Sequence, residues 1–270
     1  MPTIGFIGAG NMAEAIARGL LRTAAYQPQD ICATDPEPGR QELFARELGI
    51  SCSGEKSGAA GAEIVILAVK PFIMADALAQ IKPEVRPDAL IISIAAGISA
   101  EFIEKALATP ANPVPRVVRA MPNTPMLVGK GMSALCRGTS ATEHDLITGE
   151  RIFSAGGKTV RITEDLIDAV TGVSGSGPAY IFFMTEALTQ GGIAAGLSEL
   201  QASQLARQMV IGAAALLEQS KDSPAELRRK VTTPKGTTQA AIETMQAGGF
   251  PELMTQAVLA AMKRSKELGK

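Results

Sequence analysis

The chain has 270 residues, of which 46% are hydrophobic, and 26 basic residues against 27 acidic ones leave a formal charge of −1. This length suggests about two domains at roughly 150 residues each, with enough apolar residues for a sizeable core. A nearly neutral chain without a polybasic run argues against nucleic acid or an anionic membrane as its main partner.

Seven short β-like runs alternate with helical patterns through roughly the first 160 residues. They span 3–8, 30–35, 63–69, 89–95, 116–121, 131–136 and 158–162. Several of them, such as Ile-Val-Ile-Leu-Ala-Val at 64–69, are apolar throughout, which is typical of strands buried on both faces of a parallel sheet. The alternation predicts an α/β domain with a Rossmann-type, doubly wound sheet.

The first run leads into a G-x-G-x-x-A motif at Gly8, Gly10 and Ala13. Gly8 permits a tight turn, Gly10 lets the backbone approach a pyrophosphate, and the small Ala13 allows close helix–strand packing. The motif follows a strand and opens a helix whose N-terminus attracts phosphates, so it predicts dinucleotide binding. The predicted contacts in this turn are Gly8, Ala9, Gly10, Asn11 and Met12.

Asp35 ends the second predicted strand. An acidic side chain there accepts hydrogen bonds from the adenosine ribose and repels a 2′-phosphate, which favours NAD(H). Arg40 could still pair with such a phosphate, and an alternative role for Asp35, before Pro36, is to cap a helix. Both NADH and NADPH therefore stay open.

The cysteines and the distribution of apolar residues indicate in which cellular compartment the protein is expected. Cys32, Cys52 and Cys136 are scattered without metal-like spacing, so we expect reduced, buried thiols and no metal site. The first residues lack the pattern of a signal peptide, and no stretch approaches the ~20 apolar residues of a membrane span. These features predict a cytoplasmic protein.

Beyond residue 163 the β-like runs end and helix signals dominate, which predicts domains at 1–163 and 164–270. Capping-box sequences begin at Ser198 and Ser223, and a last helix is expected from Pro251. The helix after Gly177 is apolar on every side, so it must be buried all round. We expect a second subunit to cover it in an intertwined homodimer; the alternative is a central helix wrapped by its own neighbours.

Acid–base residues are scarce in the second half of the chain. The only histidine, His144, lies in a polar stretch at a predicted helix start, and no Lys, Arg or His occurs between Arg161 and Arg207. Reduction of a carbonyl needs a proton donor because an alkoxide is a strong base, whereas an imine nitrogen can be protonated before attack. The sequence therefore favours reduction of C=N over C=O.

Two late segments are candidates for binding substrate. Thr237 and Thr238 lie where a loop enters a helix predicted over 239–245, and amides with hydroxyls at such a start suit a carboxylate. Ser176, between two glycines ahead of Pro178, is a candidate pocket hydroxyl. The alternatives are an ordinary N-cap at Thr237 and a glycine turn needed only for its geometry.

Six motifs, in order from end to end, resemble the pyrroline-5-carboxylate reductase family. They are GFIGAGNM at 5–12, LAVKP at 67–71, AAG at 95–97, RAMPNTP at 119–125, SGSGPAY at 174–180 and PAELRRKVTTPKGTTQAAI at 224–242. The resemblance implies a Rossmann domain followed by an all-α dimerisation domain, in a homodimer or a decamer formed as a pentamer of dimers. It also implies hydride transfer from NADP(H), or NAD(H), to the C=N of 1-pyrroline-5-carboxylate, giving proline in the last step of proline biosynthesis.

The resemblance also implies residue roles. It places Ala68, Val69, Lys70, Pro71, Ala96, Gly97 and Asn123 at the cofactor, and Met121, Pro122, Ser176, Gly177, Thr233, Gly236, Thr237 and Thr238 at the substrate. In many members a partner subunit supplies the loop at 233–238. We hypothesise that the Thr238 hydroxyl hydrogen-bonds the ring nitrogen as the catalytic contact. Two departures stand out: Lys235 replaces a glycine of this loop, and Glu55 replaces an asparagine near the ribose.

Two other functions compete with this reading. A Rossmann dehydrogenase acting on a 3-hydroxy acid would be expected to carry a catalytic lysine on the first long helix of its second domain, where this chain has Pro178-Ala-Tyr-Ile-Phe-Phe. A non-catalytic NAD(P)-binding regulator would leave the Gly236-Thr-Thr loop without a purpose.

Overall fold

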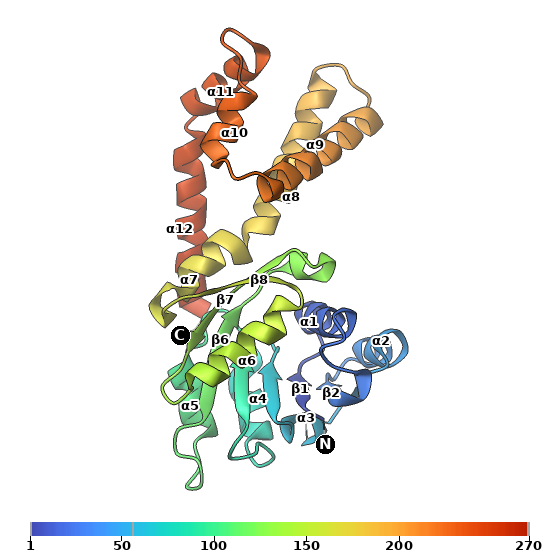
Figure 1. Cartoon of the computed structure of the whole chain (residues 1–270), viewed down its shortest axis with the longest axis vertical. Helices are drawn as coiled ribbons and strands as arrows, with labels where there is room; N and C mark the ends of the chain where they lie inside the picture. The colour runs from blue at the N-terminus through green and yellow to red at the C-terminus, as the bar shows by residue number, and fades with distance from the viewer. Residues whose placement is uncertain (1, 56, 269–270) are drawn as a thin grey trace. The chain divides into compact units, whose positions relative to one another are not determined.

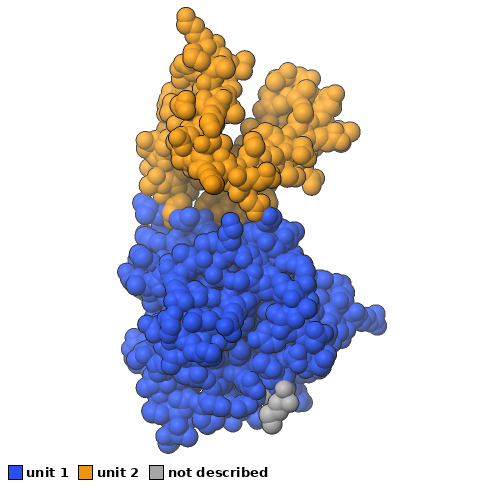
Figure 2. Space-filling view, in the orientation of Figure 1, with its two compact units in different colours: residues 1–176, 259–270 blue, residues 177–258 orange. Residues whose placement is uncertain are grey.

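The computed structural model describes residues 2–55 and 57–268 (Figure 1). Among these, the residues up to Ser176 and from Leu259 onward form one compact unit, unit 1, and Gly177–Val258 form a second, unit 2 (Figure 2). The predicted boundary between residues 163 and 164 marks the change from strands to helices, and it stays a prediction of domain organisation.

Unit 1 is built on an eight-stranded sheet in the order β3-β2-β1-β4-β5-β6-β7-β8. The strand order reverses between β1 and β4, which is the topological switch point where ligands bind in open α/β sheets. The strands are β1 Ile4–Ile7, β2 Ile31–Thr34, β3 Ser51–Ser53, β4 Ile64–Leu67, β5 Leu90–Ser93, β6 Arg116–Met121, β7 Gly131–Arg137 and β8 Gly157–Arg161.

The sheet differs from the prediction in two places. β3 was not predicted because its Ser-Cys-Ser sequence carries no apolar run; it is an edge strand paired only with β2. β7 runs antiparallel to β6, whereas the other paired strands are parallel. The connection from β6 to β7 contains only the short turn η3 (Thr124–Val128) and no crossover helix, so the chain returns beside β6 in the opposite direction.

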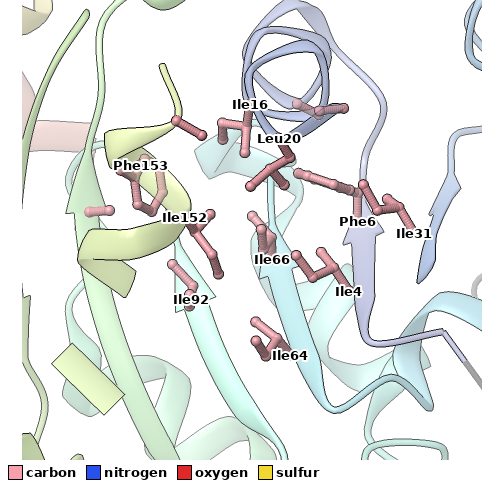
Figure 3. Packing of buried hydrophobic residues seen from close by; sticks show 14 of the residues in the cluster. Ile4, Phe6, Ile16, Leu20, Ile31, Ile64, Ile66, Ile92, Ile152 and Phe153 are labelled. Carbon is pink, nitrogen blue, oxygen red and sulfur yellow. The ribbon is translucent and has the colours of Figure 1, made fainter. Parts of the chain in front are cut away.

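Helices cover both faces of this sheet, which explains its continuous apolar runs. Side chains alternate between the faces: Phe6 joins the core cluster under α1 (Asn11–Arg22), while Ile7 joins the cluster on the other face. In Figure 3, Ile16 and Leu20 of α1 point toward the side chains of the sheet. Burial of each such side chain stabilises the folded state by roughly 1.5–3 kcal/mol relative to leaving it exposed.

The remaining helices of unit 1 connect the strands. They are α2 Pro38–Leu48, α3 Ser57–Ala60, α4 Met74–Ile81, α5 Ala100–Leu107, α6 Glu143–Ser154 and α7 Ile167–Val170, with short turns η1 Pro28–Asp30, η2 Pro71–Ile73, η4 Glu164–Leu166 and the π-helical η5 Thr171–Gly175. The C-terminal part of α12 (Phe250–Leu268) also belongs to this unit, and Ser265 donates a 2.6 Å hydrogen bond to Asp168 of α7.

Unit 2 consists of α8 Gly177–Ala194, α9 Glu199–Gln219, α10 Pro224–Lys230, α11 Thr237–Ala247 and the first part of α12. Both predicted capping boxes are confirmed, at Ser198 ahead of α9 and at Ser223 ahead of α10. Phe182 and Phe183 of α8 are 63% and 73% exposed, so the alternative in which the chain's own helices wrap α8 is wrong. Within the described residues, no helix is both long and apolar enough to cross a bilayer.

Candidate active site

The glycine-rich turn lies at the switch point of the sheet. Gly8 has φ +99°, and a Cβ built on it would lie 2.9 Å from the carbonyl carbon and oxygen of Ala68. A side chain is therefore excluded both by the backbone conformation and by the neighbouring β4 turn. Gly8 N donates to Thr34 O at 2.8 Å, and Ala68 N donates to Ile7 O at 2.8 Å, so three strand ends are tied together here.

Gly10 is a glycine for a different reason. It caps α1 with φ −68° and ψ −178°, a conformation open to any residue, and an added Cβ would meet nothing within 4 Å. The fold itself does not require glycine here. The open space lies at the N-terminus of a 12-residue helix, where free backbone N–H groups bind phosphate. These residues therefore fit the pyrophosphate of a dinucleotide.

Asp35 ties the end of β2 to this turn. Its Oδ2 accepts a 2.8 Å hydrogen bond from Ala9 N, and its Oδ1 accepts one of 3.0 Å from Glu37 N. The N-cap of α2 is Glu37, so the alternative role of Asp35 as a helix cap is wrong. Each carboxylate oxygen keeps a second lone pair, which leaves Asp35 able to accept from a ribose hydroxyl.

Arg40 is already bound by groups of the same turn. Its Nε donates to Ala9 O at 2.6 Å and its Nη2 to Glu14 Oε2 at 2.8 Å, while Glu14 also pairs with Arg18 at 2.9 Å. Burial by itself raises the pKa of Glu14, but the hydrogen bonds from Arg18 and Arg40 outweigh it and hold this pKa below its usual value. A 2′-phosphate would therefore have to compete with Glu14 for Arg40.

The other predicted cofactor residues, with two of the predicted substrate residues, gather at the same edge of the sheet, because they follow the carboxyl ends of parallel strands. Ala68, Val69, Lys70 and Pro71 follow β4, Ala96 and Gly97 come after β5, and Met121, Pro122 and Asn123 lie at the end of β6. Gly97 has φ +78°, a conformation that favours glycine. Glu55 is exposed after β3.

In unit 2, the loop between α10 and α11 carries the predicted carboxylate-binding residues. Gly236, not Thr237, is the N-cap of α11, so the alternative reading of Thr237 as an ordinary cap is wrong. Thr237 and Thr238 instead occupy the first two helical positions, where backbone N–H groups have no intrahelical acceptor. Gly236 N donates to Thr233 O at 3.0 Å, which folds the loop back on itself.

Lys235 adopts the left-handed conformation, with φ +59°. Its backbone N donates to Gln239 Oε1 at 2.7 Å, and Gln239 Nε2 donates to Glu243 Oε1 at 2.6 Å. The loop thus keeps a conformation that favours glycine although a lysine occupies the position. The hydrogen bonds of Gln239 and Glu243 hold this strained conformation in place. The exposed lysine side chain adds a positive charge to the loop.

The sheet order, the glycine-rich turn and the open space over α1 define a Rossmann-type dinucleotide-binding protein. Residues 3–97 match a family model described as NADP oxidoreductase coenzyme F420-dependent, and residues 164–268 match one described as pyrroline-5-carboxylate reductase dimerisation. A pyrroline-5-carboxylate reductase from Synechocystis sp. is 41% identical over 99% of this chain and 98% of its own.

Solved structures agree with these matches. A pyrroline-5-carboxylate reductase from Coxiella burnetii has a TM-score of 0.88 and 36% identity, covering 100% of this chain and 99% of its own. The Plasmodium falciparum enzyme with NADP bound has a TM-score of 0.87 and 27% identity, covering 100% and 98%. The chain belongs to the pyrroline-5-carboxylate reductase family, and it is an NAD(P)H-dependent oxidoreductase and a homo-oligomer. The predicted family, fold class and NAD(P)H-dependent oxidoreductase class are confirmed.

Proposed function

We propose that this protein reduces the ring C=N of 1-pyrroline-5-carboxylate to proline with a hydride from NADPH or NADH. The observation that carries the substrate assignment is the start of α11, where Gly236 takes the cap position and leaves the amides and hydroxyls of Thr237 and Thr238 for an anion. The substrate has such an anion in its carboxylate. Helix N-terminal amides and hydroxyls bind a carboxylate without any cationic partner.

The residues of the glycine-rich turn would hold a nicotinamide cofactor, which would supply the hydride for the imine carbon. The imine nitrogen is protonated first; when the hydride then adds to carbon, the π electrons of C=N become the nitrogen lone pair and the neutral secondary amine results. The iminium form is a strong electrophile, so the protein has to position the ring more than to supply a strong acid. The absence of Lys, Arg and His from α8 is consistent with this chemistry and argues against a 3-hydroxy acid substrate.

We assign cofactor contacts to Gly8, Ala9, Gly10, Asn11, Met12, Asp35, Ala68, Val69, Lys70, Pro71, Ala96, Gly97 and Asn123. We assign substrate contacts to Met121, Pro122, Ser176, Gly177, Thr233, Gly236, Thr237 and Thr238, with the Thr238 hydroxyl on the ring nitrogen. The exposed apolar surface of α8 supports an intertwined homodimer in which a partner supplies the 233–238 loop, and dimers can assemble into a decamer. The dimerisation model begins at residue 164, which supports the boundary at 163/164. Three free cysteines support a cytoplasmic location.

The Thr238→Ala variant tests the catalytic contact. Loss of one hydrogen bond worth ~1.5 kcal/mol should lower kcat/KM about tenfold. Thr244→Ala is a matched control, because its hydroxyl lies on the same helix but donates to Ala240 O at 2.9 Å within α11. Steady-state reduction of pyrroline-5-carboxylate, measured with NADPH and NADH in parallel, gives both the activity and the cofactor preference. Equal kcat/KM in the two variants and the wild type would reject the role of Thr238.

A further inference from the structure

Asn123 is buried, with 8% of the residue exposed, and both ends of its side-chain amide are engaged by backbone groups of other secondary-structure elements. Nδ2 donates to Ser174 O at 3.0 Å across 51 residues, and Oδ1 accepts from Met132 N at 2.8 Å across nine residues. The amide therefore joins the end of β6 to the start of β7 and to the π-helical turn η5. A buried amide with both ends satisfied is rigidly held.

The Ser174 carbonyl needs such a donor because of its place in the chain. In a continuing α-helix it would accept from the N–H of residue 178, but Pro178 has no N–H. The turn before it is also widened, since Ser176 N donates to Thr171 O at 2.8 Å, five residues back. The Asn123 amide supplies the donor that the helix lacks at this carbonyl. Single π-helical turns of this kind are frequent at functional sites.

Met121 holds the same turn by packing. A Cβ added to Gly175 would lie 2.7 Å from Met121 Cε, so the glycine allows the methionine side chain to lie directly against η5. Met121 and Asn123 are two residues apart at the end of β6, and they contact the adjacent residues Gly175 and Ser174. Ser176, the predicted substrate hydroxyl, is the next residue of the chain.

We propose that Asn123 is a positioning residue for catalysis. Its amide fixes the turn 174–176 against the end of β6, so that Met121 and Ser176 meet the substrate as one rigid unit. The side chain acts through this turn, and any contact of residue 123 with the cofactor is made by its backbone. The inference rests on the proposed function, because it assigns the substrate to the site that this turn borders.

The Asn123→Asp variant tests the donation to Ser174. A carboxylate can still accept from Met132 N, but it cannot donate and it places negative charge against the Ser174 carbonyl. We expect kcat with saturating pyrroline-5-carboxylate to fall about tenfold or more per folded enzyme, while the NADPH dissociation constant from calorimetry stays within about twofold. Asn112→Asp is the matched control, because Asn112 Nδ2 also donates to a backbone carbonyl, that of Pro87 at 2.8 Å, in the loop before β6 and thus at the opposite end of that strand.

A second variant, Gly175→Ala, keeps the inference testable if Asn123→Asp fails to fold. Its Cβ would displace Met121 from the same turn, so the same fall in kcat with unchanged NADPH binding is expected. A purely structural role would lower the melting temperature of both variants and leave kcat per folded enzyme at the wild-type value, and that result would overturn the inference. No turnover by the wild type would instead reject the proposed function.

Discussion

We expect the Gly10→Ala variant to fold normally and to lose most of its affinity for NADPH and NADH. The backbone at Gly10 suits any residue, and the new methyl group would meet no heavy atom within 4 Å other than those of its neighbours in the chain. Alanine is a poorer N-cap than glycine, but it also restricts the unfolded chain by ~0.4–1 kcal/mol, and these two effects oppose each other. The free energy of unfolding should therefore change by less than about 0.5 kcal/mol.

Cofactor binding should respond much more strongly. The methyl group would fill the open space at the start of α1 that a pyrophosphate must enter to reach the helix amides. Hydrogen bonds to a charged group contribute ~1.5–3 kcal/mol each, so loss of one or two of them costs about 3 kcal/mol. Since about 1.4 kcal/mol corresponds to a tenfold change in affinity, the dissociation constant should rise about 100-fold.

Calorimetric titration with each cofactor measures the affinity, and thermal denaturation without cofactor measures the fold. Gly8→Ala provides the contrast, because φ +99° and a 2.9 Å approach to Ala68 should destabilise the protein itself by about 2–3 kcal/mol. Wild-type affinity in Gly10→Ala would show that the pyrophosphate does not approach the backbone at this turn. A melting temperature lowered as far as that of Gly8→Ala would show that the space is not open.

Lys235 and the three thiols provide further predictions. Lys235→Ala removes the cation but keeps the strained left-handed backbone, so KM for the anionic substrate should rise several-fold, most clearly at low ionic strength. Lys235→Gly should raise KM by the same factor. Because glycine adopts this backbone conformation without strain, Lys235→Gly should be more stable to unfolding than Lys235→Ala by up to about 1 kcal/mol. Unchanged KM in both variants would show that the ammonium does not act on the carboxylate. Burial raises the pKa of Cys32, Cys52 and Cys136 to about 11, so only ~0.1% of each is thiolate at pH 8. Iodoacetamide labelling of the native protein at pH 8, followed by mass spectrometry, should be roughly 200-fold slower than for a free thiol of pKa ~8.5, and it should rise about tenfold per pH unit up to about pH 11. Fast labelling at pH 8 would contradict this.

Elements with strong local signals could be predicted from the sequence. The glycine-rich turn after β1, the buried strand β4 and the capping boxes of α9 and α10 each depend on residues within a few positions of one another. β3 lacked such a signal, because its polar residues become a strand only by pairing with β2. The cap of α11 was also missed, since Thr237 has the usual side chain for a cap but Gly236 takes the position.

The hydrogen-bond partners of several side chains at the site lie far away in the sequence and could not be predicted from it. The sequence pointed to Asp35 as a partner of the adenosine ribose and to Arg40 as a possible partner of a 2′-phosphate, but only the folded chain shows both bound to Ala9 of the glycine-rich turn. Nothing local to Asn123 indicates its hydrogen bonds. A clue was present in Pro178, whose missing N–H leaves the Ser174 carbonyl in need of a donor.

The sequence by itself determined the family, the order of the two parts and the positions of the turns that could bind cofactor and substrate, because glycine spacing, caps and apolar runs act over short distances. Only the tertiary structure decided which partners the polar groups around those turns find. Examples are the ion pair of Arg40 with Glu14 and the hydrogen bond from Asn123 to the Ser174 carbonyl. The physical reason is that a buried polar group must find a partner wherever the fold provides one, and that partner can lie anywhere in the chain.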